Sequence, residues 1–290
     1  STLPADMADK VKEDINRVKF EILVKKRIYV LKSDNVNAAS KSAELNSLMP
    51  MLTGATDAQK KAKYFLWTLV DLYSHFFKLE EKNYGLSEKE QGALKQLYEL
   101  TANALESRFG LLATEFSDDK FGKLSLKEKE VVVLSLYSMA LAMNKISIND
   151  NQRVGQSLFD ALSYMKDRGI ELDKEVMAGC ELFQANYLLY EKNDPEAASV
   201  IYDGLLASES ELRKAPSKDF KPKEFFFNVR IGKLSADIAQ GSISGNIEES
   251  ELAKALKEGA SALGEKHSDR LNMVIANYYL DEAHLNTDKV

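Results

Sequence analysis

The chain has 290 residues and a formal net charge of −6 at pH 7, from 39 Lys and Arg against 45 Asp and Glu. This balance argues against a nucleic-acid surface, because binding to phosphates needs clustered positive charge. The longest apolar stretch, residues 131–143, is interrupted by serines and is shorter than the roughly 20 residues that cross a bilayer, so no transmembrane segment is predicted.

Apolar residues recur every three or four positions, which is typical of amphipathic helices, and no strand alternation competes with this pattern. The pattern predicts helices over residues 5–32, 36–49, 57–82, 87–108, 125–145, 151–168, 173–192, 195–209, 221–240, 246–263 and 268–286, with a short turn near 110–116. The longest irregular connection is predicted over 209–221, which is rich in Ser, Lys and Pro. The sequence therefore predicts an all-α fold.

Capping signals support several of these boundaries. Ser87-x-x-Glu90 and Ser125-x-x-Glu128 are capping boxes, which satisfy free amides at helix starts. Asp194-Pro195 places a capping carboxylate before a proline at the first helical position. Three glycines, Gly169, Gly241 and Gly264, are predicted to end the helices before them.

A short segment of the sequence repeats itself. Residues 185–191 (ANYLLYE) recur as residues 276–282 (ANYYLDE), at about twice a spacing of 45 residues. Related segments lie between and before them, at 231–237 and 139–143. This period predicts that Ala140, Asn186, Gly232 and Asn277 occupy equivalent, closely packed positions.

The segment 182–208 resembles a tetratricopeptide repeat. The first-helix pattern of such a repeat is matched by Leu182, Ala185, Asn186 and Leu189. The turn is matched by Asn193 and Asp194, and the second-helix pattern by Ala198, Tyr202 and Leu205. The repeat is degenerate, because the usual glycine of the first helix is Asn186 and the closing proline is replaced by Ser210. The resemblance implies antiparallel helical hairpins stacked as a superhelix over 121–290, with a less regular helical region over 1–120, in one continuous domain. An irregular helical bundle is the alternative.

Few residues point to local chemistry. His75 follows Asp71 by one helical turn, and His284 follows Asp281 by three residues, so each pair has the spacing of two metal ligands. No further His or Cys accompanies either pair, so we predict no metal site, no cofactor and no catalytic residue. Cys180 is the single cysteine, and we interpret it as a small buried apolar residue.

The resemblance implies a concave groove lined by the first helix of each repeat. Phe183, Tyr187 and Tyr190 lie on one face of the best repeat, and the corresponding positions of neighbouring repeats are Lys233 and Tyr278. Aromatic rings flanked by a lysine suit an extended peptide or an amphipathic helix. The alternative is that another helix of the same chain fills the groove.

The sequence thus favours a non-enzymatic binding or scaffold protein that holds a protein or peptide partner. A helical enzyme or small-ligand-binding protein, with a site built from residues distant in sequence, is the runner-up. The chain begins with Ser1 and not with Met, which suits an exported, periplasmic lipoprotein with a lipid anchor upstream of Ser1 slightly better than a trimmed cytosolic protein.

Overall fold

The computed structural model describes residues 5–33, 35–60, 62, 64–83, 85–111, 116–143, 145–217, 220–243 and 245–287. Side chains are described in these ranges except at residues 5–9, 38, 81–83, 151–152 and 281–287. All regular structure in these ranges is helical, which confirms the predicted all-α class. The chain divides into two compact units, residues 1–169 and 170–290. The predicted division at residue 120 separates a less regular helical region from the helical repeats, and it stays a prediction.

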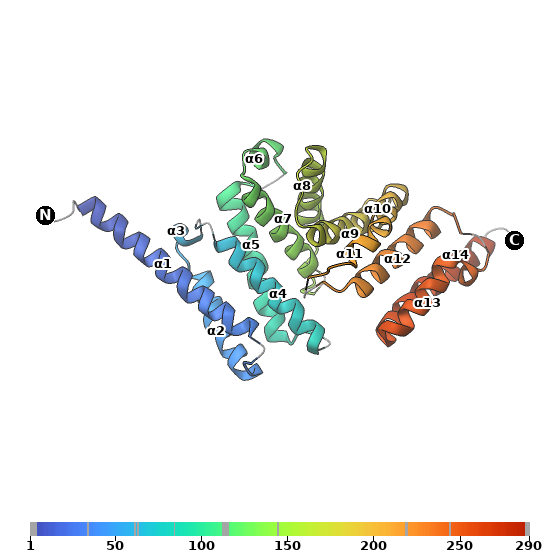
Figure 1. Cartoon of the computed structure of the whole chain (residues 1–290), viewed down its shortest axis with the longest axis horizontal. Helices are drawn as coiled ribbons and strands as arrows, with labels where there is room; N and C mark the ends of the chain where they lie inside the picture. The colour runs from blue at the N-terminus through green and yellow to red at the C-terminus, as the bar shows by residue number, and fades with distance from the viewer. Residues whose placement is uncertain are drawn as a thin grey trace. The chain divides into compact units, whose positions relative to one another are not determined.

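Unit 1 is built around α4. Its helices are α1 (Ala5–Lys32), α2 (Ala38–Thr53), α3 (Asp57–Lys60), α4 (Phe65–Asn83), α5 (Glu88–Phe109), α6 (Asp118–Gly122), α7 (Leu126–Met143), the π-helical turn η1 (Asn151–Gly155) and α8 (Gln156–Asp167) (Figure 1). Helix α4 packs against α1, α5 and α7, and its fully buried side chains include Leu69, Tyr73 and Phe76. The Tyr73 hydroxyl donates a hydrogen bond of 3.3 Å to Thr101 Oγ1 of α5.

Unit 2 is a succession of packed helices. These are α9 (Lys174–Tyr190), α10 (Pro195–Ala207), α11 (Glu209–Leu212), α12 (Pro222–Ala239), the 3-10 turn η2 (Ile247–Glu249), α13 (Glu251–Leu263) and α14 (Glu265–Thr287). Each of the long helices packs against the next one along the chain, and α12 also contacts α9 and α14. Stacked helix pairs are therefore present, as the repeat prediction requires.

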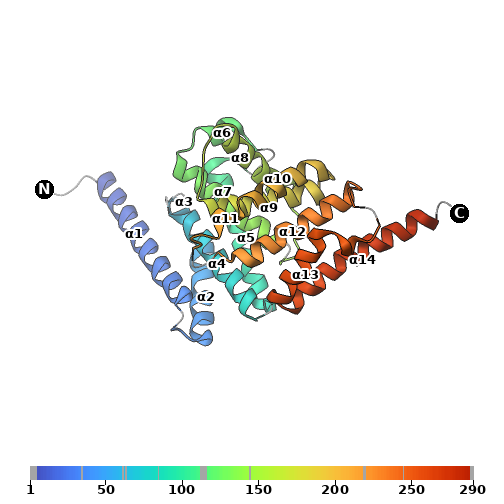
Figure 2. The same ribbon diagram turned by 45° about the vertical axis from the view of Figure 1, so that its right-hand side comes forward.

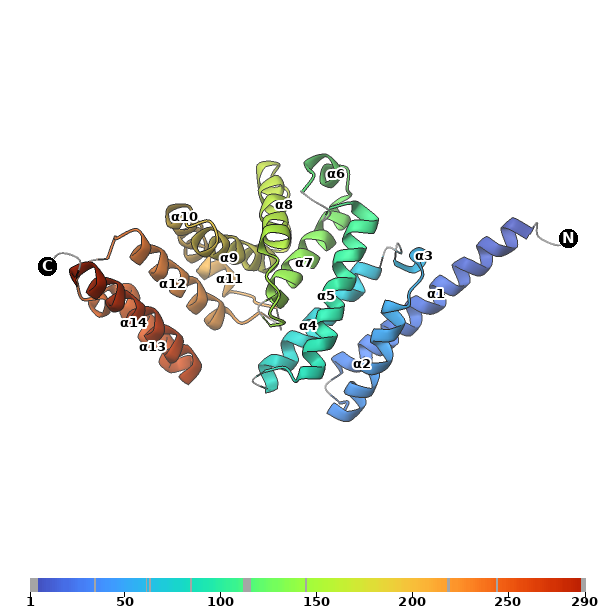
Figure 3. The ribbon, with the colours of Figure 1, turned by 180° about the vertical axis from the view of Figure 1, so that it is seen from behind.

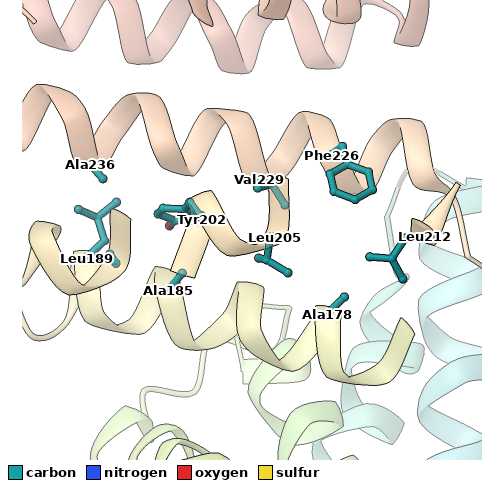
Figure 4. Packing of buried hydrophobic residues seen from close by; sticks show 10 residues of the cluster. Ala178, Ala185, Leu189, Tyr202, Leu205, Leu212, Phe226, Val229 and Ala236 are labelled. Atoms are coloured by element: carbon teal, nitrogen blue, oxygen red, sulfur yellow. The ribbon is translucent and has the colours of Figure 1, made fainter. Parts of the chain in front are cut away.

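The seam between α9, α10 and α12 is centred on Tyr202. Figure 4 shows Tyr202 and Leu205 of α10 between Ala185 of α9 and the facing helix α12. The Tyr202 hydroxyl donates to Asn186 Oδ1 at 2.7 Å, and Tyr202 itself is fully buried. A Cβ added to Gly232 would lie 2.4 Å from Tyr202 Cε1 and Cζ. Tyr202 thus fills the space that the absent side chain of Gly232 leaves.

The predicted equivalence of four repeat positions is only partly met. Ala140 and Gly232 are buried, and Asn186 is half-buried, but Asn277 is exposed. Helix α14 buries Leu271, Ile275 and Tyr278 instead. The prediction for Asn277 is therefore wrong, because the buried side of α14 is turned away from the position that the self-match suggests.

Most local capping signals are confirmed, and at Ser125 one half of the predicted box is present, with the Ser125 amide donating to Glu128 Oε2 at 3.1 Å. Ser87 and Glu90 form a complete capping box at the start of α5, and Asp194 caps α10 with Pro195 in its first turn. Gly169, Gly241 and Gly264 all have positive φ just after a helix.

Several helix boundaries differ from prediction, and three of these differences have a clear structural cause. Helix α2 continues past Pro50 to Thr53, where the Gly54 amide donates to the Pro50 carbonyl at 2.9 Å. The predicted helix 57–82 is interrupted between α3 and α4, where Arg108 Nη1 donates to the Ala62 carbonyl at 3.0 Å. The connection predicted as irregular over 209–221 starts with α11, since Leu212 packs into the core beside Phe226 (Figure 4).

Candidate partner-binding surface

The three aromatic residues predicted on α9 differ in exposure. Phe183 and Tyr187 stack with ring centroids 6.2 Å apart and an interplanar angle of 17°. Tyr187 is buried, and Lys192 Nζ lies 5.5 Å from the centroid of its ring. Phe183 is half-buried, whereas Tyr190 is 61% exposed. Of the three, Tyr190 offers an open ring.

Lys233 of α12 is engaged by polar groups of its own unit. Its Nζ donates to Asp237 Oδ1 at 2.6 Å and to Ser199 Oγ at 2.8 Å, and lies 3.5 Å from Asp203 Oδ2. Burial lowers the pKa of Lys233, but the hydrogen bond to Asp237 and the two carboxylates raise it overall. Lys233 therefore stays protonated, and its contacts with Ser199 and Asp203 link α12 to α10.

Tyr278 of α14 belongs to the core that α12, α13 and α14 share. It is buried in a cluster that includes Phe227 and Ile275, and its hydroxyl donates to the Gly245 carbonyl at 3.1 Å. The adjacent Tyr279 is 41% exposed and donates to Asn246 Oδ1 at 2.9 Å. Both rings hold α14 against the loop that precedes η2.

The predicted open aromatic stripe is therefore corrected. Phe183 and Tyr187 do come together, but Tyr187 and Tyr278 are buried and Lys233 is engaged by α10 and α12. At Tyr187, Tyr278 and Lys233, neighbouring groups of the chain itself cover or bind the side chain. Whether any of the five residues binds a partner stays a prediction.

Helix α14 has an exposed apolar side that the sequence prediction missed. Met273 is 61% exposed and Leu280 is 58% exposed, and the small exposed Ala276 lies between them. The spacing i, i+3, i+7 places these three side chains on one side of the helix, roughly opposite the buried Ile275 and Tyr278. The spacing is present in the sequence, but periodicity alone does not show which side of the helix the rest of the chain covers.

Three of the residues considered for chemistry, Asp71, His75 and Cys180, are buried or engaged by a neighbouring group. Asp71 Oδ1 accepts a hydrogen bond of 2.5 Å from Lys32 Nζ, and His75 is buried, with its pKa lowered to about 4 by burial. Burial also raises the pKa of the Cys180 thiol to about 12. The side chains of Asp281 and His284 lie outside those described. Among the described side chains, no group of three or more His, Cys, Asp and Glu residues could hold a metal ion.

In the part of the chain that the structure covers, no helix combines the length and apolarity needed to cross a membrane. Comparison of the chain with protein-family models, with curated proteins and with solved structures finds no match.

Proposed function

We propose that this chain is a non-enzymatic scaffold protein that holds a protein partner on a stack of tetratricopeptide-like helix pairs in unit 2. The observation that carries the proposal is the exposed apolar side of α14. The partner that fits this side is an amphipathic helix, because one helix covers another best through apolar residues at spacings of three and four.

The internal helix α12 shows how such a side is used within the unit. Its Phe226, Val229 and Ala236 pack with α9 and α10, whereas Phe227, Ile231 and Leu234 pack with α13 and α14. An internal helix of a stack thus buries two sides.

Helix α14 has the same two-sided character. Leu271, Ile275 and Tyr278 cover the α12 and α13 side, while Met273 and Leu280 leave a second apolar side in solvent. Large apolar side chains that share one side of a helix mark an interaction surface better than isolated ones do. A partner helix placed there would extend the stack by one element.

The seam around Tyr202 supports the repeat interpretation. Small or short side chains at Asn186 and Gly232 let three helices approach around one large ring, as in the repeat family that the sequence resembles. Tyr190, exposed at the end of α9, adds an open aromatic side chain on unit 2.

The test is site-specific photo-crosslinking in cells that express the full chain. A photoreactive amino acid is introduced at Met273, at Leu280, and at Lys254 of α13 as the exposed polar control. We expect the same discrete adduct with another protein from the first two positions and none from Lys254. We also expect Leu280→Glu to remove the adduct formed from position 273. Absence of adducts at both apolar positions, or equal adducts at Lys254, would contradict the proposal.

A further inference from the structure

Helix α1 has a continuous apolar stripe in solvent. Val11, Ile15, Val18 and Ile22 are 45%, 48%, 47% and 61% exposed. Their spacing of four, three and four residues is that of the apolar a and d positions of a coiled-coil heptad, whose seven positions are lettered a to g. Ile15 and Ile22 are then at a, and Val11 and Val18 are at d. Four such residues in register form a seam and not a scatter of single exposed side chains.

This stripe is on the side of α1 that unit 1 leaves free. The C-terminal half of the helix is attached through the buried Val24, Ile28 and Leu31 and through an ion pair of 2.5 Å between Arg27 and Glu44 of α2. Figures 1, 2 and 3 show the first turns of α1 extending beyond α2, while α3 lies beside the middle of α1. A second helix therefore has access to the seam.

The charges beside the seam identify what fits it. The g positions are Asp14 and Glu21, and the e positions that follow them by five residues are Lys19 and Lys26. In a parallel pair of identical helices, each g residue faces the e residue of the next heptad on the other helix, so each acid meets a lysine. In an antiparallel pair, g faces g and e faces e, so acids would meet acids and lysines would meet lysines.

The charged groups are open enough to take these roles. Lys19 and Lys26 are exposed, and Asp14 and Glu21 are half-buried. Within one chain, Asp14 Oδ1 is 2.9 Å from Arg17 Nη1, but both side chains of this pair remain about half exposed. An exposed pair one helical turn apart is weak, so it does not prevent Asp14 from meeting a second partner.

We propose that a second copy of this chain docks on α1 and forms a short, parallel, two-stranded coiled coil with layers at Val11, Ile15, Val18 and Ile22. The charges beside the seam favour the parallel orientation, because only in a parallel pair does each acid meet a lysine. The seam ends at Lys25, the next d position, whose Nζ lies 4.4 Å from the centroid of the Tyr64 ring in its own unit. This interface is separate from the α14 surface, so either proposal can fail alone.

The first test is sedimentation equilibrium of the full chain up to about 100 µM, a range suited to a seam of only four layers. We expect the average mass to rise from one chain toward two. Ile15→Ser with Ile22→Ser should weaken the association by at least about tenfold, because both a layers lose their apolar contact. Leu23→Ser is the matched control, since Leu23 is 48% exposed on the same helix but lies off the seam. Circular dichroism should be the same for all variants.

The second test fixes the orientation. Val11→Cys should give a disulfide-linked dimer on mild oxidation, because a parallel pair brings the two copies of position 11 together, whereas an antiparallel pair places position 11 opposite position 22. Leu23→Cys is the control for random crosslinking, and the native Cys180 is buried. Lys19→Glu with Lys26→Glu should weaken self-association, and mixing this chain with one that carries Asp14→Lys and Glu21→Lys should restore it.

The proposal is wrong if the wild-type chain stays monomeric, if the double Ile variant associates as the wild type does, or if position 11 crosslinks no better than position 23. A monomeric wild type would mean that a different protein or segment covers the stripe. A trimer would overturn the two-stranded form.

Discussion

Replacing Gly232 by alanine tests the seam that joins α9, α10 and α12. The new methyl group would lie 2.4 Å from Tyr202 Cε1 and Cζ and 2.6 Å from its hydroxyl oxygen. The Tyr202 ring cannot step aside freely, because it is fully buried and its hydroxyl donates to Asn186.

The expected magnitude combines three contributions. Overpacking a filled site costs about 1–3 kcal/mol, and weakening the hydrogen bond to Asn186 costs about 0.5–1.5 kcal/mol. Alanine is a better helix former than glycine by about 0.8–1.0 kcal/mol, which offsets part of this cost. We therefore expect Gly232→Ala to lower the free energy of unfolding by about 2 kcal/mol.

Urea unfolding followed by circular dichroism measures this change. The matched control is Gly204→Ala on α10, where the added methyl meets no atom within 4 Å, so only the gain in helix propensity, up to about 1 kcal/mol, remains. A second control places Gly232→Ala in a Tyr202→Leu background, because leucine lacks the ring atoms that the methyl would meet. The reasoning is refuted if Gly232→Ala is as stable as the wild type, or if its cost is the same in the Tyr202→Leu background.

Three further tests use substitutions at Asn186, at His75 and at Tyr278, the last with Tyr190 as its exposed counterpart. Asn186→Leu should cost roughly 1–3 kcal/mol in urea unfolding, since it overfills the seam and leaves the buried Tyr202 hydroxyl without its acceptor; a variant as stable as the wild type would contradict this. Burial lowers the pKa of His75 to about 4 in the folded chain. As the pH falls, His75 therefore binds a proton in the unfolded chain before it does so in the folded chain, and the free energy of unfolding should drop by about 3 kcal/mol between about pH 6.5 and pH 4. His75→Gln should remove that part of the pH dependence in parallel unfolding series, and an unchanged slope would speak against it. Tyr278→Ala should cost about 3–5 kcal/mol because it empties a core site, whereas Tyr190→Ala, with an exposed ring, should change stability by less than about 0.5 kcal/mol; equal effects would show that Tyr278 is not core.

The sequence predicted features that depend on residues close together along the chain. The capping box of Ser87 and Glu90 and the cap of Asp194 before Pro195 need only neighbouring groups, and both are present. The interruption between α3 and α4 was missed because it involves Arg108, a residue of a different helix, which holds the Ala62 carbonyl.

The candidate site was harder to predict for the same reason. Periodicity shows that Tyr187 and Tyr278 share a side of their helices with other apolar residues, but it does not show whether that side is covered. The exposure of Met273 and Leu280 likewise depends on where the neighbouring helices lie. The self-match that linked Asn186 to Asn277 failed because similar segments can be rotated differently against their neighbours.

The order of helices in unit 2 has a consequence for folding kinetics. Its packed pairs are mostly neighbours along the chain, and the link between α9 and α10 is only four residues long, with Asn193 at a φ of 52°. Contacts between near neighbours need little loop closure, and proteins rich in them fold quickly. We expect the α9–α10 hairpin to form early and the later helices to add to it one after another.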